Sequence, residues 1–203
     1  MICSNCGYSS RHQEIVAEKS TVVCPSCKLE NGIFRLPLFV VTGGGGSGKS
    51  TVACGLRGRL DTCLVLEADL FYPIQESTKS NDDYWSYLIF LCRELMQNGK
   101  PVVLFGWVNP RQCEASEDIG YFSSVHYLVL VSDKHTQEAR IRGRYPALRD
   151  EPPTDEFIAM ALQATQILRD EADERSRVTV LDTTGMSVDD TLAETASWIS
   201  ARL

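Results

Sequence analysis

The stretch V-V-T-G-G-G-G-S-G-K-S-T, residues 40–51, decides the fold. It continues an apolar run that starts at Leu38, and its spacing G-x-x-x-x-G-K-S is that of a phosphate-binding loop (P-loop, Walker A) between a strand and a helix. Backbone N–H groups of such a loop approach phosphate oxygens closely, which side chains at the glycine positions would obstruct. The lysine supplies charge for the β and γ phosphates, and the serine hydroxyl is a ligand for Mg²⁺. The predicted site for a nucleoside triphosphate with Mg²⁺ comprises Gly43, Gly44, Gly45, Gly46, Ser47, Gly48, Lys49, Ser50 and Thr51.

The composition limits the size and the class of the protein. The chain has 203 residues, of which 43 % are hydrophobic, so it has room for one substantial core and a small module. Its net charge of −7 disfavours a protein whose main activity is to grip the nucleic-acid backbone. No apolar run reaches the roughly 18 to 20 residues of a membrane span, and the N-terminus lacks the pattern of a signal peptide. We expect a cytoplasmic protein.

Four of the eight cysteines form two C-x-x-C pairs near the N-terminus, separated by 17 residues: Cys3 with Cys6, and Cys24 with Cys27. This spacing is typical of a structural zinc site, in which four thiolates complete a tetrahedral shell. Residues 14–23 are predicted to form a β-hairpin between the pairs, and residues 1–35 resemble a zinc ribbon. A pair of redox-active motifs is the alternative. The pattern leaves open whether the module stabilises the chain or recognises a nucleic acid or a protein.

Apolar runs of strand length alternate with amphipathic helices after the P-loop. Strands are predicted over 38–42, 62–67, 101–107, 125–131 and 177–182, and helices over 49–60, 84–98, 157–172 and 188–201. Continuously apolar strands are typical of a parallel sheet covered on both faces. Residues 36–203 are therefore predicted to form a three-layer α/β domain with a five-stranded parallel sheet. We interpret residues 75–83 as a polar loop. The predicted core positions of the third helix are Phe157, Met160, Ala161, Ala164, Ile167 and Leu168.

The ends of the second and third strands carry candidate site residues. Asp69 follows the second strand, and ligands of α/β sheets bind beyond the carboxyl ends of the strands, so we expect Asp69 in the crevice of the P-loop. The third strand ends in Gly106, where many P-loop ATPases place an acidic residue. This difference favours a small kinase over a motor or switch ATPase. Trp107, Asn109 and Arg111 are then expected to project into the acceptor pocket.

Four arginines follow the fourth strand within ten residues: Arg140, Arg142, Arg144 and Arg149. Guanidinium groups stabilise the charge on a phosphoryl group in transfer, so we predict a mobile, arginine-rich lid around residues 134–152. The alternative is a surface helix whose arginines pair with Glu138, Asp150 and Glu151.

The order of these features over residues 38–203 resembles the small P-loop kinases, a group that includes adenylate, shikimate, gluconate and nucleoside kinases. The C-terminal half looks closest to bacterial nucleoside-kinase-like ATPases. The resemblance implies that Asp69 holds an acceptor hydroxyl and takes its proton. It also implies that Arg140 stacks on the adenine and that Arg144 or Arg149 reaches the transferring phosphoryl group. The loop that borders the base would contain Asp182 and Thr183.

These interpretations predict ATP- and Mg²⁺-dependent phosphoryl transfer to a small acceptor, such as a nucleoside, a nucleotide or a similar hydroxyl compound. The predicted catalytic residues are Lys49, Asp69, Arg140, Arg144 and Arg149. One alternative is a kinase for a nucleic-acid 5′ end, with the zinc ribbon as its grip. A second is a regulatory ATP-binding adaptor that docks a partner protein through the ribbon.

Overall fold

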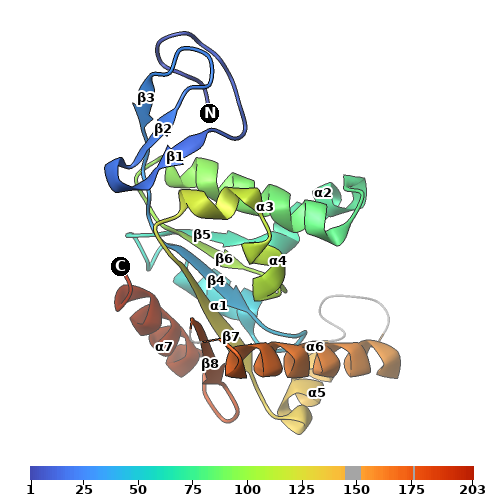
Figure 1. The fold of residues 1–203 in the computed structure, drawn as a ribbon. Coiled ribbons are helices and arrows are strands. Elements are labelled where there is room, and N and C mark those ends of the chain that lie inside the picture. The colour runs from blue at the N-terminus through green and yellow to red at the C-terminus, as the bar shows by residue number, and fades with distance from the viewer. Residues whose placement is uncertain (145–151, 176) are drawn as a thin grey trace.

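A five-stranded parallel sheet forms the centre of the computed structural model, which describes residues 1–144, 152–175 and 177–203. The strand order is β5-β6-β4-β7-β8, so the strand that leads into the P-loop is central (Figure 1). The strands are β4 (Leu38–Thr42), β5 (Leu64–Glu67), β6 (Val102–Phe105), β7 (Val125–Val131) and β8 (Val178–Asp182). The predicted α/β fold with a five-stranded parallel sheet is confirmed.

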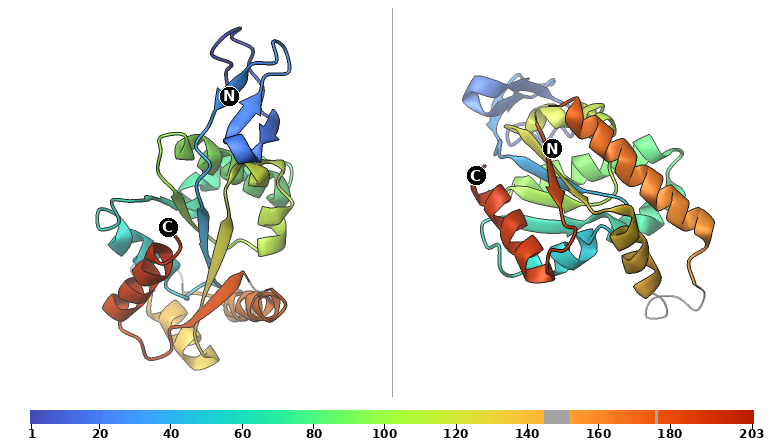
Figure 2. Two further views of the ribbon diagram at one scale, coloured as in Figure 1. Left: turned by 60° about the vertical axis from the view of Figure 1, so that its left-hand side comes forward. Right: turned by 90° about the horizontal axis from the view of Figure 1, so that it is seen from below.

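Helices cover both faces of this sheet and make three layers (Figure 2). The helices are α1 (Lys49–Leu56), α2 (Tyr72–Ser77), α3 (Asn81–Met96), α4 (Pro110–Glu114), α5 (Lys134–Gly143), α6 (Asp155–Asp173) and α7 (Val188–Ser200). Side chains alternate between the two faces of β4. Leu38 and Val40 are buried with α3, whereas Phe39 and Val41 are buried with α1 and α7. The P-loop therefore leaves the middle of a sheet that is covered on both sides.

The polar segment 75–83 is not the predicted loop. It contains the end of α2, the link to α3 and the first turn of α3. Ser80 is the N-cap of α3, and its hydroxyl accepts a hydrogen bond from the backbone N–H of Asp83 at 3.1 Å. Pro73 lies in the first turn of α2, where a missing N–H costs nothing. The polar residues that suggest a loop are therefore caps and exposed first turns.

The buried face of helix α6 matches the predicted one only in part: Ala161 and Leu168 are buried as expected. Phe157, Met160 and Ile167 were expected in the core, but they are 43 %, 55 % and 44 % exposed. The buried face is formed by Ile158, Ala161, Thr165, Leu168 and Glu171. Apolar residues occur on both faces of this helix, and its contacts with the P-loop and β7 select the face that includes two polar residues. Among the described residues, no helix is both long and apolar enough to cross a membrane.

The arginine-rich segment begins inside a helix. α5 continues to Gly143, so Arg140 and Arg142 are helical residues, and Arg144 follows directly at the C-cap. The predicted lid, 134–152, thus starts as a regular helix. Residues 145–151 lie outside the described part of the chain.

Residues 1–35, here called the N-terminal lobe, contain a separate three-stranded antiparallel sheet. Its strands are β1 (Glu14–Val16), β2 (Thr21–Val23) and β3 (Glu30–Gly32), with a 3-10 turn, η1 (Ala17–Lys19), between the first two. The predicted hairpin is confirmed. The third strand is missing from the prediction because Asn31 and Gly32 have the composition of a linker.

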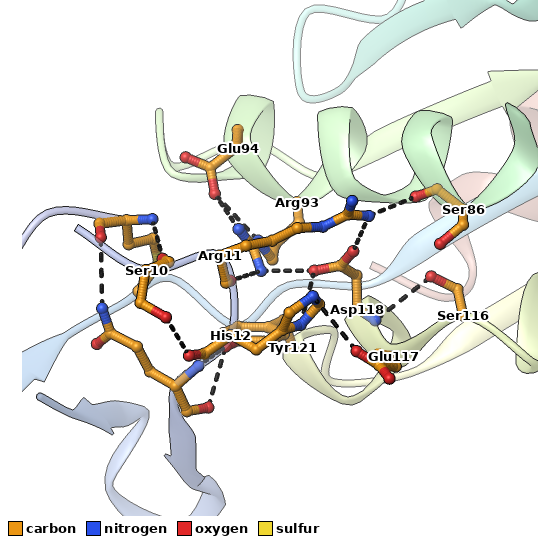
Figure 3. Close-up of polar contacts among 12 residues, drawn as sticks. Ser10, Arg11, His12, Ser86, Arg93, Glu94, Ser116, Glu117, Asp118 and Tyr121 are labelled. Carbon is orange, nitrogen blue, oxygen red and sulfur yellow. Dashed lines mark hydrogen bonds and ion pairs between the residues drawn. The ribbon is translucent and has the colours of Figure 1, made fainter. Parts of the chain in front are cut away.

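A buried ionic network fastens the lobe to α3 and to the 3-10 turn η3 (Glu117–Tyr121), as Figure 3 shows. Arg93 and Asp118 have fully buried side chains, and Arg93 Nη1 donates to Asp118 Oδ1 at 2.5 Å. From the lobe, Arg11 Nη2 donates to Asp118 Oδ2 at 3.0 Å, and its backbone carbonyl accepts from Arg93 at 2.7 Å. The hydroxyl of Tyr121 bonds both backbone groups of Gln13. The lobe therefore packs on the rest of the chain, here called the P-loop region (residues 36–203).

Candidate active site

The P-loop connects β4 to the first turn of α1. Gly46 and Gly48 have φ angles of 77° and 97°, in the left-handed region that glycine adopts without strain. Gly48 is the N-cap of α1, so the positive end of that helix faces the loop. The ammonium group of Lys49 donates to the carbonyl oxygens of Gly43 and Gly44, at 2.7 and 2.9 Å. The Lys49 side chain thus lies against the loop in which the phosphates are expected to bind.

The charges around Lys49 come from two other predicted site residues. Burial lowers the pKa of Lys49 to about 8, the Asp69 carboxylate opposes this shift, and the Arg144 guanidinium adds to it. Glu67, at the end of β5, also acts to raise it. The fold therefore brings Lys49, Asp69 and Arg144 into one electrostatic neighbourhood.

Helices α5 and α6 pack against the outer side of the P-loop. A Cβ atom on Gly44 would lie 2.2 Å from the Thr165 hydroxyl oxygen, and one on Gly46 would lie 2.7 Å from Ile141 Cγ1. Phosphate approach was the predicted reason for these glycines. The structure adds a second reason, because two helices contact the loop too closely for any side chain.

A pocket of about 360 Å³ opens beside the P-loop, between the end of α5 and the start of α7, a size within the range of small-molecule sites. Gly46, Ser47, Gly48 and Thr51 of the loop line it, together with Arg140, Gly143, Arg144, Thr183, Met186 and Val188. The guanidinium of Arg140 donates to the hydroxyl and the carbonyl oxygen of Thr183, both at 2.9 Å. Three residues predicted to contact the nucleotide from outside the loop, Arg140, Arg144 and Thr183, therefore share one pocket with the P-loop.

Asp69 lies in a 3-10 turn, η2 (Ala68–Phe71), directly after β5. Helix α3 supports this turn, because the Tyr84 hydroxyl donates to the Ala68 carbonyl at 2.8 Å. Burial raises the pKa of Tyr84 to about 12, and the Asp69 carboxylate adds to the shift. Gly106 is required here, since a Cβ atom at this position would lie 2.9 Å from Trp85 Cη2. The packing of α3 on the ends of β5 and β6 thus sets the position of Asp69.

Arg142 points to the surface rather than to the pocket. Its guanidinium pairs with Glu138 at 2.9 Å and with Asp155 at 2.8 Å. For this residue the surface-helix alternative describes the structure better than the lid. Arg149, the last predicted arginine, lies outside the described residues.

Asp182 does not line the pocket that the described residues form beside the P-loop, although the resemblance to kinases implied contact with the nucleotide. Its carboxylate accepts from the backbone N–H of Thr184 at 2.9 Å and faces Arg169 of α6 at 3.6 Å. Successive side chains at the end of a strand point to opposite sides, so the neighbouring Thr183 faces the pocket instead.

Of the three residues expected in the acceptor pocket, Asn109 caps a helix and Arg111 links two helices. Asn109 caps α4, and its side chain accepts from the backbone N–H of Arg111 at 2.8 Å. The guanidinium of Arg111 pairs with Glu171 at 2.6 Å and with Glu174 at 3.0 Å, both on α6. Trp107 is half exposed beyond the end of β6.

The four predicted metal ligands meet in the N-terminal lobe. The sulfur atoms of Cys3, Cys6, Cys24 and Cys27 all lie within 4.8 Å of one another, and two of the pairs are 3.6 Å apart. A tetrahedral zinc site with Zn–S bonds of about 2.3 Å has sulfur atoms about 3.8 Å apart. The backbone N–H groups of Cys6 and Asn5 lower the pKa of Cys3 to about 6, which favours its thiolate. The backbone N–H of Tyr8 acts to lower the pKa of Cys6, but burial and the three neighbouring cysteines outweigh it and raise that pKa to about 11. The donor set and its spacing fit Zn²⁺.

No protein-family model matches the sequence, and no curated protein matches it. Many solved structures share the fold, and we describe three of them. A gluconokinase from Sinorhizobium meliloti 1021 gives a TM-score of 0.57 at 17 % identity, covering 83 % of this chain and 94 % of that one. A sugar kinase from Janibacter sp. HTCC2649 gives 0.59 at 18 %, covering 81 % and 95 %. A shikimate kinase from Acinetobacter baumannii gives 0.53 at 16 %, covering 82 % and 94 %. The chain therefore has the fold of the small P-loop kinases, together with a four-cysteine cluster in its N-terminal lobe.

Proposed function

We propose that the protein is a kinase that transfers the γ-phosphoryl group of ATP to a hydroxyl group of a small molecule. One observation carries this proposal: the charges of Asp69 and Arg144 both act on Lys49, and Arg144 lines a pocket together with P-loop residues. A phosphoryl-transfer site needs this combination of a phosphate anchor, a proton acceptor and a second cation. The gluconokinase and shikimate kinase that share the fold support the same reaction class.

The nucleotide would bind with its phosphates on residues 43–51 and its adenine in the part of the pocket lined by Arg140, Thr183 and Val188. Ser50 would hold Mg²⁺, which neutralises charge on the β and γ phosphates when bound. Arg140 would form one wall of the base site, since its guanidinium is already held by Thr183.

In the proposed reaction an acceptor oxygen forms a bond to the γ phosphorus while the bond from that phosphorus to the ADP oxygen breaks. Asp69 takes the proton that the acceptor hydroxyl loses. Lys49 and Arg144 stabilise the negative charge on the phosphoryl oxygens during transfer. The acceptor would enter from the side of Asp69, because the opposite side of the P-loop is closed by α5 and α6.

The N-terminal lobe would have a structural role: a zinc-stabilised module that packs on α3 and η3. Three of its four basic residues already have partners: Arg11 binds Asp118, Lys19 binds Glu30, and Arg35 donates to three backbone carbonyls. Lys28 has no acidic partner among the described residues. A lobe whose cations are occupied supports bracing over a grip on nucleic acid.

The test is incubation with labelled ATP, Mg²⁺ and pooled nucleosides, nucleotides and sugars, followed by mass spectrometry for a product heavier by one phosphoryl group. Asp69→Asn should lower turnover by about 10²- to 10⁴-fold and leave ATP affinity nearly unchanged. Asp61→Asn changes an exposed aspartate before β5 and is the matched control. Normal turnover of Asp69→Asn would exclude the base role. Tight ATP binding without any product, alongside a copurifying protein, would favour the adaptor.

A further inference from the structure

The P-loop contains four consecutive glycines, Gly43 to Gly46. Glycine loses more conformational freedom on ordering than any other residue, so a run of four is costly to hold in one shape. A loop that binds phosphate through its backbone N–H groups gains affinity when its peptides are already oriented. A contact from outside the loop is therefore needed to restrict them.

Gln137 of α5 makes such a contact. Gln137 is only 1 % exposed. Its side-chain amide nitrogen donates to the Gly45 carbonyl at 2.7 Å and to the Thr165 hydroxyl at 2.8 Å. The Ala161 carbonyl lies 3.2 Å from the same nitrogen. Both amide hydrogens thus have acceptors in a buried environment. The side chain ties the tip of the P-loop to α5 and α6.

The bond to Gly45 also sets the direction of the next N–H group. In a trans peptide the carbonyl of one residue and the N–H of the following residue point in opposite directions. Because the Gly45 carbonyl is held toward Gln137, the N–H of Gly46 points away from Gln137. We infer that it faces the concave side of the loop. Gly46 is buried and lines the nucleotide pocket, and its N–H has no acceptor among the described residues. A buried donor without a partner is a binding group for an anion.

We propose that Gln137 is a positioning residue: it holds the Gly45–Gly46 peptide so that the Gly46 N–H donates to a phosphate of the bound nucleotide. This inference rests on the nucleotide binding proposed above. It extends that proposal to a residue that touches the loop and not the nucleotide.

The hydrogen bonds from Lys49 to the loop, unlike the bond from Gln137, are expected to break when phosphate binds. The carbonyls of Gly43 and Gly44 accept from Lys49, and those bonds break when the lysine turns to the phosphates. The bond from Gln137 approaches from the side of the helices, so it persists in the complex. The same helix carries Arg140 one turn later and ends beside Arg144. α5 therefore positions the loop and the two pocket arginines as one unit.

The experiment compares the binding of ATP and of adenosine by titration calorimetry. Gln137→Met keeps the length of the side chain and removes both donors. It should weaken ATP binding about tenfold, since one hydrogen bond to a charged group is lost, and leave adenosine affinity within about twofold. Gln166→Met is the matched control, because the amide of that exposed glutamine bonds only Asp170. The control should bind both ligands as the wild type does.

Two results would overturn the proposal. One is ATP affinity within twofold of the wild type in folded Gln137→Met. The other is an equal loss for ATP and adenosine, which would indicate general loosening of the pocket. Where thermal unfolding shows that Gln137→Met is not folded, Gln137→Asn replaces it, because a side chain one methylene shorter does not reach Gly45, and the same outcomes apply. If the wild-type protein binds ATP but transfers no phosphoryl group, the proposed kinase activity is refuted, and the proposed role of Gln137 in ATP binding still stands.

Discussion

The N-terminal lobe and the P-loop region are held together by different interactions. In the P-loop region, β4 and β6 are buried along their whole length, and helices cover both faces of the sheet. The lobe has three strands of three residues each, and its buried hydrophobic residues are Cys3, Val22 and Cys24. So little apolar surface does not stabilise a domain by itself. The lobe therefore depends on its cysteine cluster and on its contacts with α3 and η3, whereas the P-loop region has a core of its own.

The largest expected effect concerns the P-loop region alone. Lys49→Ala removes the proposed phosphate anchor, so we expect phosphoryl transfer to fall by about 10³-fold or more. The metal content of the lobe should stay the same, because in the described structure the Lys49 ammonium hydrogen-bonds only to residues of the P-loop. Initial rates with labelled ATP and a zinc-release assay measure the two quantities. Lys100→Ala, a lysine that bonds only the Asp61 carbonyl, is the control. Loss of metal in Lys49→Ala would show that the two regions are not separate.

Metal removal should affect the lobe and spare the P-loop region. We expect the double substitution Cys24→Ser and Cys27→Ser, or a strong chelator, to unfold β1–β3 because a small metal-held unit loses its main support. Hydrogen exchange should then show loss of protection in the lobe, while β4 to β8 stay protected and ATP affinity changes by less than about threefold. Cys54→Ser, at an exposed cysteine of α1, controls for the loss of a thiol. A parallel loss of ATP binding would make the lobe part of the nucleotide site.

The two arginines at the contact between the lobe and the P-loop region should contribute unequally to the free energy of unfolding. Arg93→Met leaves Asp118 buried without its closest partner, which should cost about 3 to 5 kcal/mol of unfolding free energy. Arg11→Met removes a half-exposed partner of the same carboxylate and should cost less than about 1 kcal/mol. Replacing both Arg93 and Asp118 by apolar residues should recover much of the loss. Denaturant unfolding measures all three, and equal costs for the two arginine variants would contradict this ranking.

The smallest effect is a pH dependence inside the P-loop region. Burial lowers the pKa of His126, and the charges of Arg202 and Arg177 add to the shift, so the folded state favours the neutral ring. The unfolded pKa is about 6.5. The stabilisation is therefore complete above that pH and is lost as the pH falls through the lower, folded value. The unfolding midpoint should drop more between pH 7.5 and 5.5 in the wild type than in His126→Gln. An equal drop would assign the acid sensitivity to other groups.

Local patterns predicted most of the fold. The five strands, the four predicted helices (α1, α3, α6 and α7) and the hairpin between the cysteine pairs lie close to their predicted positions, because each is a run with its own periodicity and its own start and stop signals. Helix α5, with ten residues, was predicted as part of a lid, and shorter helices were missed. α4, for example, has only five residues, although Asn109 and Pro110 are typical of a helix start.

The predictions failed where more than one partner was available. Arg140 and Arg142 lie two residues apart on α5, yet one binds Thr183 beside the pocket and the other pairs with Asp155 on the surface. Because both residues are arginines, the sequence alone does not show which of them lies beside the pocket. Likewise, α6 has apolar residues on two faces, and only its neighbours decide which face is buried. The sequence of one helix therefore does not determine which of its faces packs against the rest of the protein.

The sequence by itself determined the P-loop, the two cysteine pairs and the alternation of strands and helices, since each depends on residues within a few positions of one another. The tertiary structure decided the contacts between distant residues: Gln137 with Gly45, and Arg11 with Asp118. These pairs are 92 and 107 positions apart in the chain. No local propensity specifies such a contact, because it forms only after helices and strands have packed around a common core.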